Sequence, residues 1–408
     1  MSSLSLFGGS GMAMLLFFFG GAGLPLGAPP EKENPVMAYV APEECVLYAT
    51  WAGMATPNPV SPNHTEQLLA EPEVQEFAAA IERAFASYLR TASPPGDEPR
   101  PSDEFVRTAP LWVRTLITRP TAIYVTRLES QGQRGPERLL AEGGMIVHAG
   151  EAAATLDKSL TLLLTSEDLK PQAVTIGTRQ FHMLPASDEL LPMDLYWGAG
   201  NGYLMVGLGK GSIEAMSARI KAQKEPQWLP KLRAAAGIER RSSLSYVNVK
   251  KMVDTFAPLG GPQTEAVLAS LGLRQITTLG AVTGMDDVGM VSKTLVGIEG
   301  PPRGLLTLLE SEGIAAADLA HIPTDALIAS AFSLEASKVL ETVIEAAAEV
   351  DPRAADGIQE GLAEFERETG VNLAGVLAAL GNNWSLHAAA ADGGMLGAAV
   401  AVELKDRG

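Results

Sequence analysis

The chain has 408 residues, of which 46% are hydrophobic and 19% charged. This composition excludes a disordered chain and predicts two or three globular domains. There are 48 acidic and 31 basic residues, giving a net charge of −17, which argues against nucleic acid as a partner. The single cysteine, Cys45, excludes an internal disulfide and a cysteine-rich metal site. It begins an apolar stretch, where we expect a buried, unreactive thiol.

The N-terminus carries an apolar block, MAMLLFFF at residues 12–19, followed by small residues. Residues 1–28 therefore resemble a signal peptide or a hydrophobic anchor, and a cytoplasmic tail is a further alternative. No Lys or Arg precedes the block, so the signal is atypical. We expect an extracytoplasmic location, in the periplasm, the cell envelope or the medium, with membrane contact only through this segment if it is retained. Residues 29–40 read as a linker.

Two distant stretches open alike: APEECVLYATWAGMA at 41–55 and IPTDALIASAFSLEA at 322–336. Aligned, their prolines and acidic residues coincide and Trp51 falls on Phe332. Each opening predicts a proline-led turn, a buried strand and then a helix. A shared proline and acid are weak evidence alone, so the segments that follow must also agree.

The segments after each opening follow one order. After the first come helices at 65–90 and 105–117, strands at 121–128 and 144–148, and a helix at 151–164. After the second opening come a helix at 333–348, a further helix that runs to about 368, and a short helix at 373–380. Strands at 383–390 and 397–404 follow. Between them lie a strand and helix at 242–256, a helix at 263–273, a hairpin at 274–300 and a helix from 301. Additional hairpins and a helix at 212–223 separate the first copy from this one.

This order predicts an α+β protein of tandem β-α-α-β-β-α modules, with mainly antiparallel sheets and helices packed on one face. The first module spans 41–237 with additional β-hairpins, the second spans 238–318 and the third spans 319–408. The third is expected to be incomplete at its C-terminus, because its final helix is missing.

Four stretches resemble those of a known family: PEECVLYATW, LLAEPEVQEF, GYLMVGLGKGSIEAMSARI and FERETGVNLAGVLAALGNNWSLHAAA. The chain resembles, over residues 40–406, the uncharacterised exported bacterial proteins related to domain of unknown function 3352, of the planctomycete type. The shared motifs are diffuse and none is a catalytic signature. The resemblance implies an envelope or extracellular location without an assigned activity.

The sequence GLGKGS at 207–212 lies between a predicted strand and helix, where backbone N–H groups can bind phosphate. Its spacing matches neither GxxxxGK[ST] nor GxGxxG. We therefore interpret it as structural, with Ser212 capping the helix. The adjacent acids Asp286 and Asp287 are interpreted as turn formers, not as metal ligands. The triplet at 63–65 matches a glycosylation acceptor but is common by chance.

The five histidines show no metal-binding spacing, and the sequence has no GxSxG motif. The sequence therefore nominates no catalytic residue, metal site or cofactor. Trp51 and Trp384 are predicted to pack in the core. Trp228 lies between prolines and is predicted to be exposed, as a ligand or partner contact. The sequence favours a non-enzymatic binding or scaffolding protein for an unknown protein, peptide or cell-surface ligand. The alternatives are a hydrolase with a site assembled between modules and a self-assembling envelope subunit.

Overall fold

The structure is a computed structural model that describes residues 27–92, 101–131, 138–165, 169–187, 192–310, 313–324, 326–389 and 397–405. The apolar block of the expected signal or anchor lies outside the described residues. Two compact units are formed, Met1–Thr255 with Thr278–Gly297 and Phe256–Thr277 with Ile298–Gly408. The expected modules were defined by a repeated order of elements and not by compactness, and their boundaries stay a prediction.

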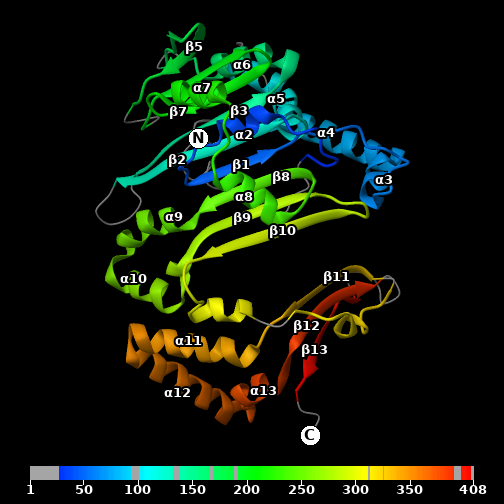
Figure 1. Cartoon of the computed structure of the whole chain (residues 1–408), viewed down its shortest axis with the longest axis vertical. Helices are drawn as coiled ribbons and strands as arrows, with labels where there is room; N and C mark the ends of the chain where they lie inside the picture. Colours follow the sequence, from blue (N-terminus) through cyan, green and yellow to red (C-terminus); the bar gives the residue numbers. More distant parts are fainter. Residues whose placement is uncertain are drawn as a thin grey trace. The chain divides into compact units, whose positions relative to one another are not determined.

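The first unit is built on a ten-stranded antiparallel sheet, which confirms the α+β class (Figure 1). Its strand order is β10-β9-β8-β1-β2-β3-β7-β6-β5-β4. The strands are β1 (Leu47–Trp51), β2 (Thr121–Gln131), β3 (Arg138–His148), β4 (Gln172–Ile176), β5 (Arg179–Leu184), β6 (Leu195–Gly200), β7 (Tyr203–Leu208), β8 (Arg240–Asn248), β9 (Ile276–Met285) and β10 (Met290–Ile298).

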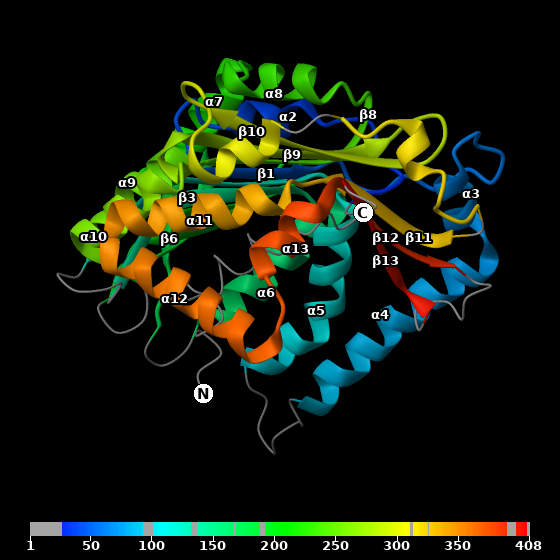
Figure 2. The ribbon, with the colours of Figure 1, turned by 90° about the horizontal axis from the view of Figure 1, so that it is seen from below.

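Helices cover both faces of this sheet. Figure 2 shows α2 (Pro35–Val40), α7 (Ser212–Ala222) and α8 (Trp228–Ala236) on one side and α5 (Pro101–Thr118) and α6 (Ala153–Leu163) on the other. Strand β3 shows why both faces of the sheet are covered by helices. Its neighbouring residues Ile146 and Val147 point to opposite faces, and both are buried. The module helices α5 and α6 lie on one face, as expected. The second face is covered by α2, α7 and α8, which lie outside the repeated order of elements (Figure 2).

The remaining helices of the first unit are α3 (His64–Ala70), α4 (Pro72–Ala92) and α9 (Val249–Phe256). The long helix expected at 65–90 is thus two helices, since Glu71, between α3 and α4, has extended backbone angles. The residue before a proline disfavours helical angles, and Pro72 follows Glu71.

Residues 29–40 are part of the folded unit, which corrects the expectation of a linker. Pro30 forms a bridge with Met54, and Met37 and Val40 of α2 are buried in the core. The Asn34 side chain accepts a hydrogen bond from the N–H of Val36, and a proline occupies the first helical position. These are ordinary helix-start signals, and the polar composition around them concealed a helix of only six residues.

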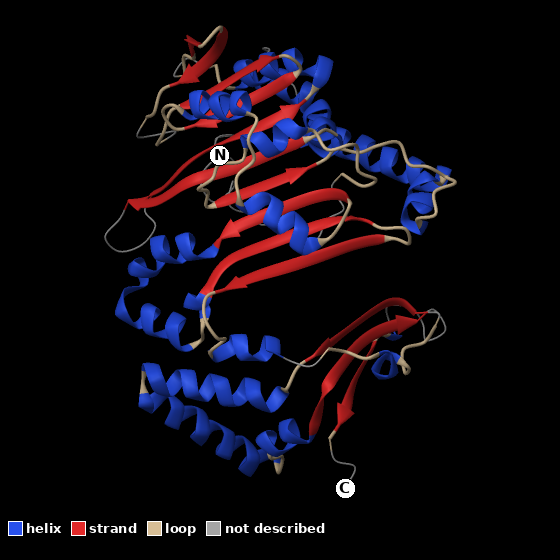
Figure 3. Cartoon of the chain, in the orientation of Figure 1, coloured by secondary structure: helices blue, strands red, loops and turns tan. Residues whose placement is uncertain are grey.

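The second unit contains a three-stranded antiparallel sheet and a group of helices, distinguished by colour in Figure 3. The sheet order is β11-β12-β13, with β11 (Ala326–Ser333), β12 (Leu380–Ala389) and β13 (Ala399–Leu404). The helices are α10 (Gly261–Ser270), α11 (Ala336–Val350), α12 (Pro352–Thr369) and α13 (Leu373–Ala379). Helix α11 packs against α10 and α12. Asp351 caps α12 by accepting from the N–H of Arg353, at the break that Asp351-Pro352 predicted.

The same order of elements occurs three times along the chain. Once α3 and α13, which have no counterpart in the other sets, are left out, it runs β1-α4-α5-β2-β3-α6, then β8-α9-α10-β9-β10, then β11-α11-α12-β12-β13. In each set the three strands are neighbours in the order first, second, third. The helix expected from residue 301 is a short 3-10 helix, Gly304–Glu310. The repeated order agrees with a duplicated unit of sheet and helices.

Candidate functional site

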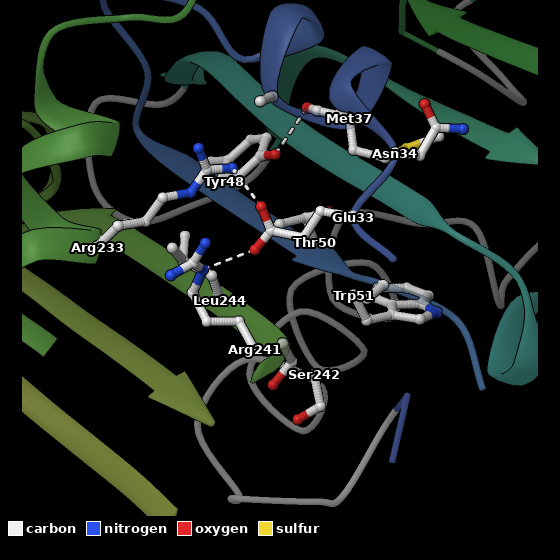
Figure 4. A pocket seen from close by; sticks show the side chains of 13 residues that line it. Glu33, Asn34, Met37, Tyr48, Thr50, Trp51, Arg233, Arg241, Ser242 and Leu244 are labelled. Atoms are coloured by element: carbon white, nitrogen blue, oxygen red, sulfur yellow. Dashed lines mark hydrogen bonds and ion pairs between the residues drawn. The ribbon is translucent and has the colours of Figure 1, made fainter. Parts of the chain in front are cut away.

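A small cavity lies in the first unit, where β1, β8 and α8 meet the residues that precede α2 (Figure 4). Its volume is about 30 Å³. On this measure a cavity needs about 10–15 Å³ to hold one water molecule, whereas ligand pockets usually measure roughly 300–1,000 Å³. The cavity therefore has room for one or two water molecules and is too small for a substrate or a cofactor.

The charged groups around the cavity bind one another. Figure 4 shows Glu33 between two arginines: its carboxylate accepts from Nε of Arg241 at 2.6 Å and lies 3.6 Å from Nη2 of Arg233. Arg233 also donates to both carboxylate oxygens of Glu225 at 3.0 Å. The hydroxyl of Tyr48 donates to a main-chain carbonyl of α2 at 2.7 Å, and burial raises the pKa of Tyr48, which keeps it protonated. These hydrogen bonds and ion pairs connect the segment before α2 to α8 and β8.

Trp228 begins α8 and is half-buried against the sheet. Its ring stacks on Tyr246 with centroids 4.2 Å apart and meets the ring of Tyr48 edge-on at 5.4 Å. Its indole N–H donates to the carbonyl of Pro42 at 3.0 Å. The expected exposure of Trp228 is therefore wrong, because the flanking prolines belong to the start of a packed helix and not to a loop. Its role as a partner contact stays a prediction.

Ser385 on β12 meets His321 in the second unit, a contact that the sequence did not indicate. Ser385 Oγ and His321 Nε2 lie 2.5 Å apart, and the rings of His321 and His387 have centroids 6.2 Å apart. A nucleophile must be reached by its substrate, but Ser385 is only 2% exposed. Within the described residues no carboxylate bonds to His321, so the pair has no acid to orient the imidazole. The contact supports the sheet better than it supports catalysis. Since 64 residues separate the two, no local motif could have revealed it.

The glycine-rich junction GLGKGS serves the packing of α7 on β7. Gly211, with φ of +76°, is the N-cap of α7 and makes no side-chain cap, while Ser212 is the first helical residue. The expected cap by Ser212 is therefore wrong. A Cβ atom at Gly207 would lie 2.3 Å from Ser212 Oγ, so a larger residue there would displace the Ser212 side chain at the start of α7. Lys210 is exposed.

The turn between β9 and β10 is stabilised by Asp286. Its Oδ1 accepts from the N–H groups of Gly289 and Val288, each at 2.8 Å, and these bonds lower the pKa of Asp286. The interpretation of Asp286 as a turn former is confirmed. The side-chain amide of Asn63 is fully buried and donates to the carbonyls of Asp286 and Gly289, so it is not accessible for glycosylation.

Cys45 and two sheet histidines have the structural roles expected of them. Cys45 is 1% exposed and burial raises its pKa to about 12, which makes the thiol unreactive. The ring of His148 lies 4.8 Å from that of Tyr203, and His182 stacks on Trp197 at 5.4 Å. These histidines pack against neighbouring strands of the sheet.

In the described part of the chain, no group of three or more His, Cys, Asp or Glu side chains is placed to hold a metal ion. The described helices include none with the length and apolar character needed to cross a bilayer. No family model, curated protein or solved structure matches this chain. The resemblance to proteins related to domain of unknown function 3352 therefore stays a prediction.

Proposed function

We propose that this protein is a non-enzymatic binding or scaffolding protein of the cell envelope, and that the β11-β12-β13 sheet carries its binding surface. The observation that supports the proposal is a group of exposed apolar side chains on one face of this sheet. Phe332 is 46% exposed, Leu386 42% and Val400 69%.

The strand register places these side chains together. Leu386 lies opposite Val400 on β13, and Phe332 lies opposite Trp384, two residues before Leu386 on β12. Residues two apart on a strand point to the same face, so all four side chains share it. Apolar residues gathered on one exposed face mark interaction sites more often than the scattered apolar residues of ordinary surfaces. A protein or peptide partner is the chemistry that such a face fits.

The location in the envelope rests on the apolar block at residues 12–19, which has the layout of an export signal. The alternative function, hydrolysis, has its nearest support in the contact between Ser385 and His321. The burial of Ser385 speaks against it, because a substrate carbonyl cannot approach the hydroxyl without the sheet opening.

The test compares capture of proteins from envelope fractions by the wild-type chain and by a double variant, Leu386→Glu with Val400→Glu. Two carboxylates on the apolar face should reduce the amount of captured partner at least tenfold, since burying unpaired charges opposes binding. The matched control is Val60→Glu in the first unit, where Val60 is 84% exposed. Equal capture by wild type and the double variant, at equal circular dichroism, would contradict the proposed surface.

A further inference from the structure

The first and second modules are joined through their first strands. Strand β1 pairs with β8 antiparallel, in a register that runs from Leu47 opposite Val247 to Trp51 opposite Ser243. Backbone bonds continue the ladder beyond both ends, from the N–H of Asn248 to the carbonyl of Val46 and from the N–H of Ala52 to Ser242, each 2.8 Å. Each first strand thus uses one edge for its own second strand and the other edge for the first strand of another module.

Strand β11 is the first strand of the third module and lies at the edge of its sheet. It pairs with its second strand, β12, as β1 pairs with β2. No described strand pairs with its other edge. Ala329, Ser330 and Phe332 along this strand are exposed. In the third module, the edge that corresponds to the pairing of β1 with β8 therefore has no partner among the described strands.

Corresponding residues of β11 and β1 direct their backbone N–H and C=O groups to the same edge of the strand. The N–H of Leu334 donates to the carbonyl of Asn382 at 2.7 Å, which continues the register of β11 with β12. Because backbone groups of an antiparallel strand alternate between its two neighbours, those of Ala329, Ala331 and Ser333 point to the open edge. With Trp51 aligned on Phe332, these three positions correspond to 48, 50 and 52. In β1, the residues at these positions direct their backbone groups toward β8.

The open edge of β11 lacks the features that usually block strand pairing. Natural sheets protect their edges with charged residues, prolines or very short strands. Edge strands β10 and β13 carry Lys293 and Glu403, and β4 has five residues and follows Pro171. Strand β11, ALIASAFS, has eight residues without a charge or a proline. The sequence of β11 therefore permits the pairing that the other edges oppose.

We infer that β11 pairs antiparallel with β11 of a second copy of this chain, so that two copies form a dimer with a continuous sheet. This inference rests on the proposed function, since it names the partner of the same small sheet. A second copy offers what the fold already uses, because β1 and β8 are first strands paired in antiparallel order. Such a pairing is self-complementary about a two-fold axis, as in most homodimers. The outward residues centre on Ala331, so the two Ala331 residues face each other.

Solution mass measured across a dilution series tests the dimer. The wild-type chain should show twice the 42.9 kDa mass of one chain. Ala331→Pro removes an outward N–H without removing a bond to β12, and Ala329→Lys places a charge at the open edge. Each should raise the dissociation constant of the dimer at least tenfold. The matched control is Ala399→Lys, since Ala329 and Ala399 both lie opposite His387, on the two edges of the sheet. The control should leave the mass unchanged.

Oxidative cross-linking tests the register independently of any loss of folding. Hydrogen-bonded residues opposite each other have Cα atoms about 5.5 Å apart, within the range that a disulfide spans. Ala331→Cys should therefore form a covalent dimer under mild oxidation. Wild type should not, because Cys45 is buried, and Ala399→Cys, on the far edge, should not either.

The outcomes separate this inference from the proposed function. A wild-type chain that stays monomeric, or a dimer that persists in Ala331→Pro and dissociates in Ala399→Lys, would overturn pairing through β11. If the chain is monomeric but still captures another protein through the apolar face, only the choice of partner is wrong. If Leu386→Glu with Val400→Glu also leaves capture unchanged, the proposed function fails with it.

Discussion

Trp51 and Phe332 hold the same place in the first and third modules, yet their surroundings differ. Trp51 is 6% exposed, lies under α5 and donates its indole N–H to the carbonyl of Leu116 on that helix. Phe332 is 46% exposed and has an aromatic neighbour, Trp384, in parallel orientation at 6.3 Å. Among the described strands, β1 has partners on both edges, whereas β11 has a partner on one edge. The comparison teaches that one strand pattern yields a core or a surface according to the neighbours that the rest of the chain supplies.

The largest expected effect is at the buried position. Trp51→Ala should lower the free energy of unfolding of the first unit by about 3–5 kcal/mol, because it removes a buried aromatic ring and leaves a cavity. Urea unfolding followed by circular dichroism measures the change. A loss below about 1 kcal/mol would mean that the cover of β1 by α5 is loose and that the two positions are equivalent after all.

A smaller effect, dependent on pH, is expected from Glu66 in the first unit. Burial alone would raise the pKa of Glu66, but bonds from Arg240 and Ser61, each 2.8 Å, outweigh it, and the pKa lies below its ordinary value. The folded pKa is then lower than the unfolded one, near 4.3. The stabilisation is present above the unfolded pKa and is lost as pH falls through the folded pKa.

Glu66→Gln should therefore cost about 1 kcal/mol at pH 7 and make the stability less dependent on pH below about 4.5. Urea midpoints at pH 7 and at pH 3 measure this difference. Glu335→Gln in the second unit is the matched control, since the pKa of Glu335 is lowered by bonds from Lys405 and Lys338 at a partly exposed site. Equal pH profiles for wild type and Glu66→Gln would show that the Glu66 contacts add nothing to the first unit.

The smallest effect on stability is expected at the exposed position. Phe332→Ala should change the free energy of unfolding by less than about 1 kcal/mol, since much of the ring is already in contact with water. Urea unfolding of a monomeric background, such as Ala329→Lys, avoids any contribution from self-association. A loss as large as that of Trp51→Ala would show that Phe332 is part of a core, and the contrast between the modules would disappear.

Most strands and helices of the repeat were predictable because their patterns are local. The hairpin expected around residues 285–287 is β9 and β10, which end and begin at Met285 and Met290. Helix α8 and the burial of Trp228 were not predictable, because two prolines in a short polar stretch are as typical of a loop as of a helix start. The network of Glu33 with Arg241 and Arg233 was hidden for another reason: its members lie about 200 residues apart in the chain.

The sequence by itself determined the order of most strands and helices of the repeat, the turn at Asp286 and the inert burial of Cys45, because apolar periodicity, prolines and turn residues act over a few neighbouring residues. Only the tertiary structure decided which copies share a sheet, which face of β1 is covered and where Trp228 packs. Strand pairing is made by backbone groups that every residue carries, so its partners leave almost no trace in the residues of the strand itself.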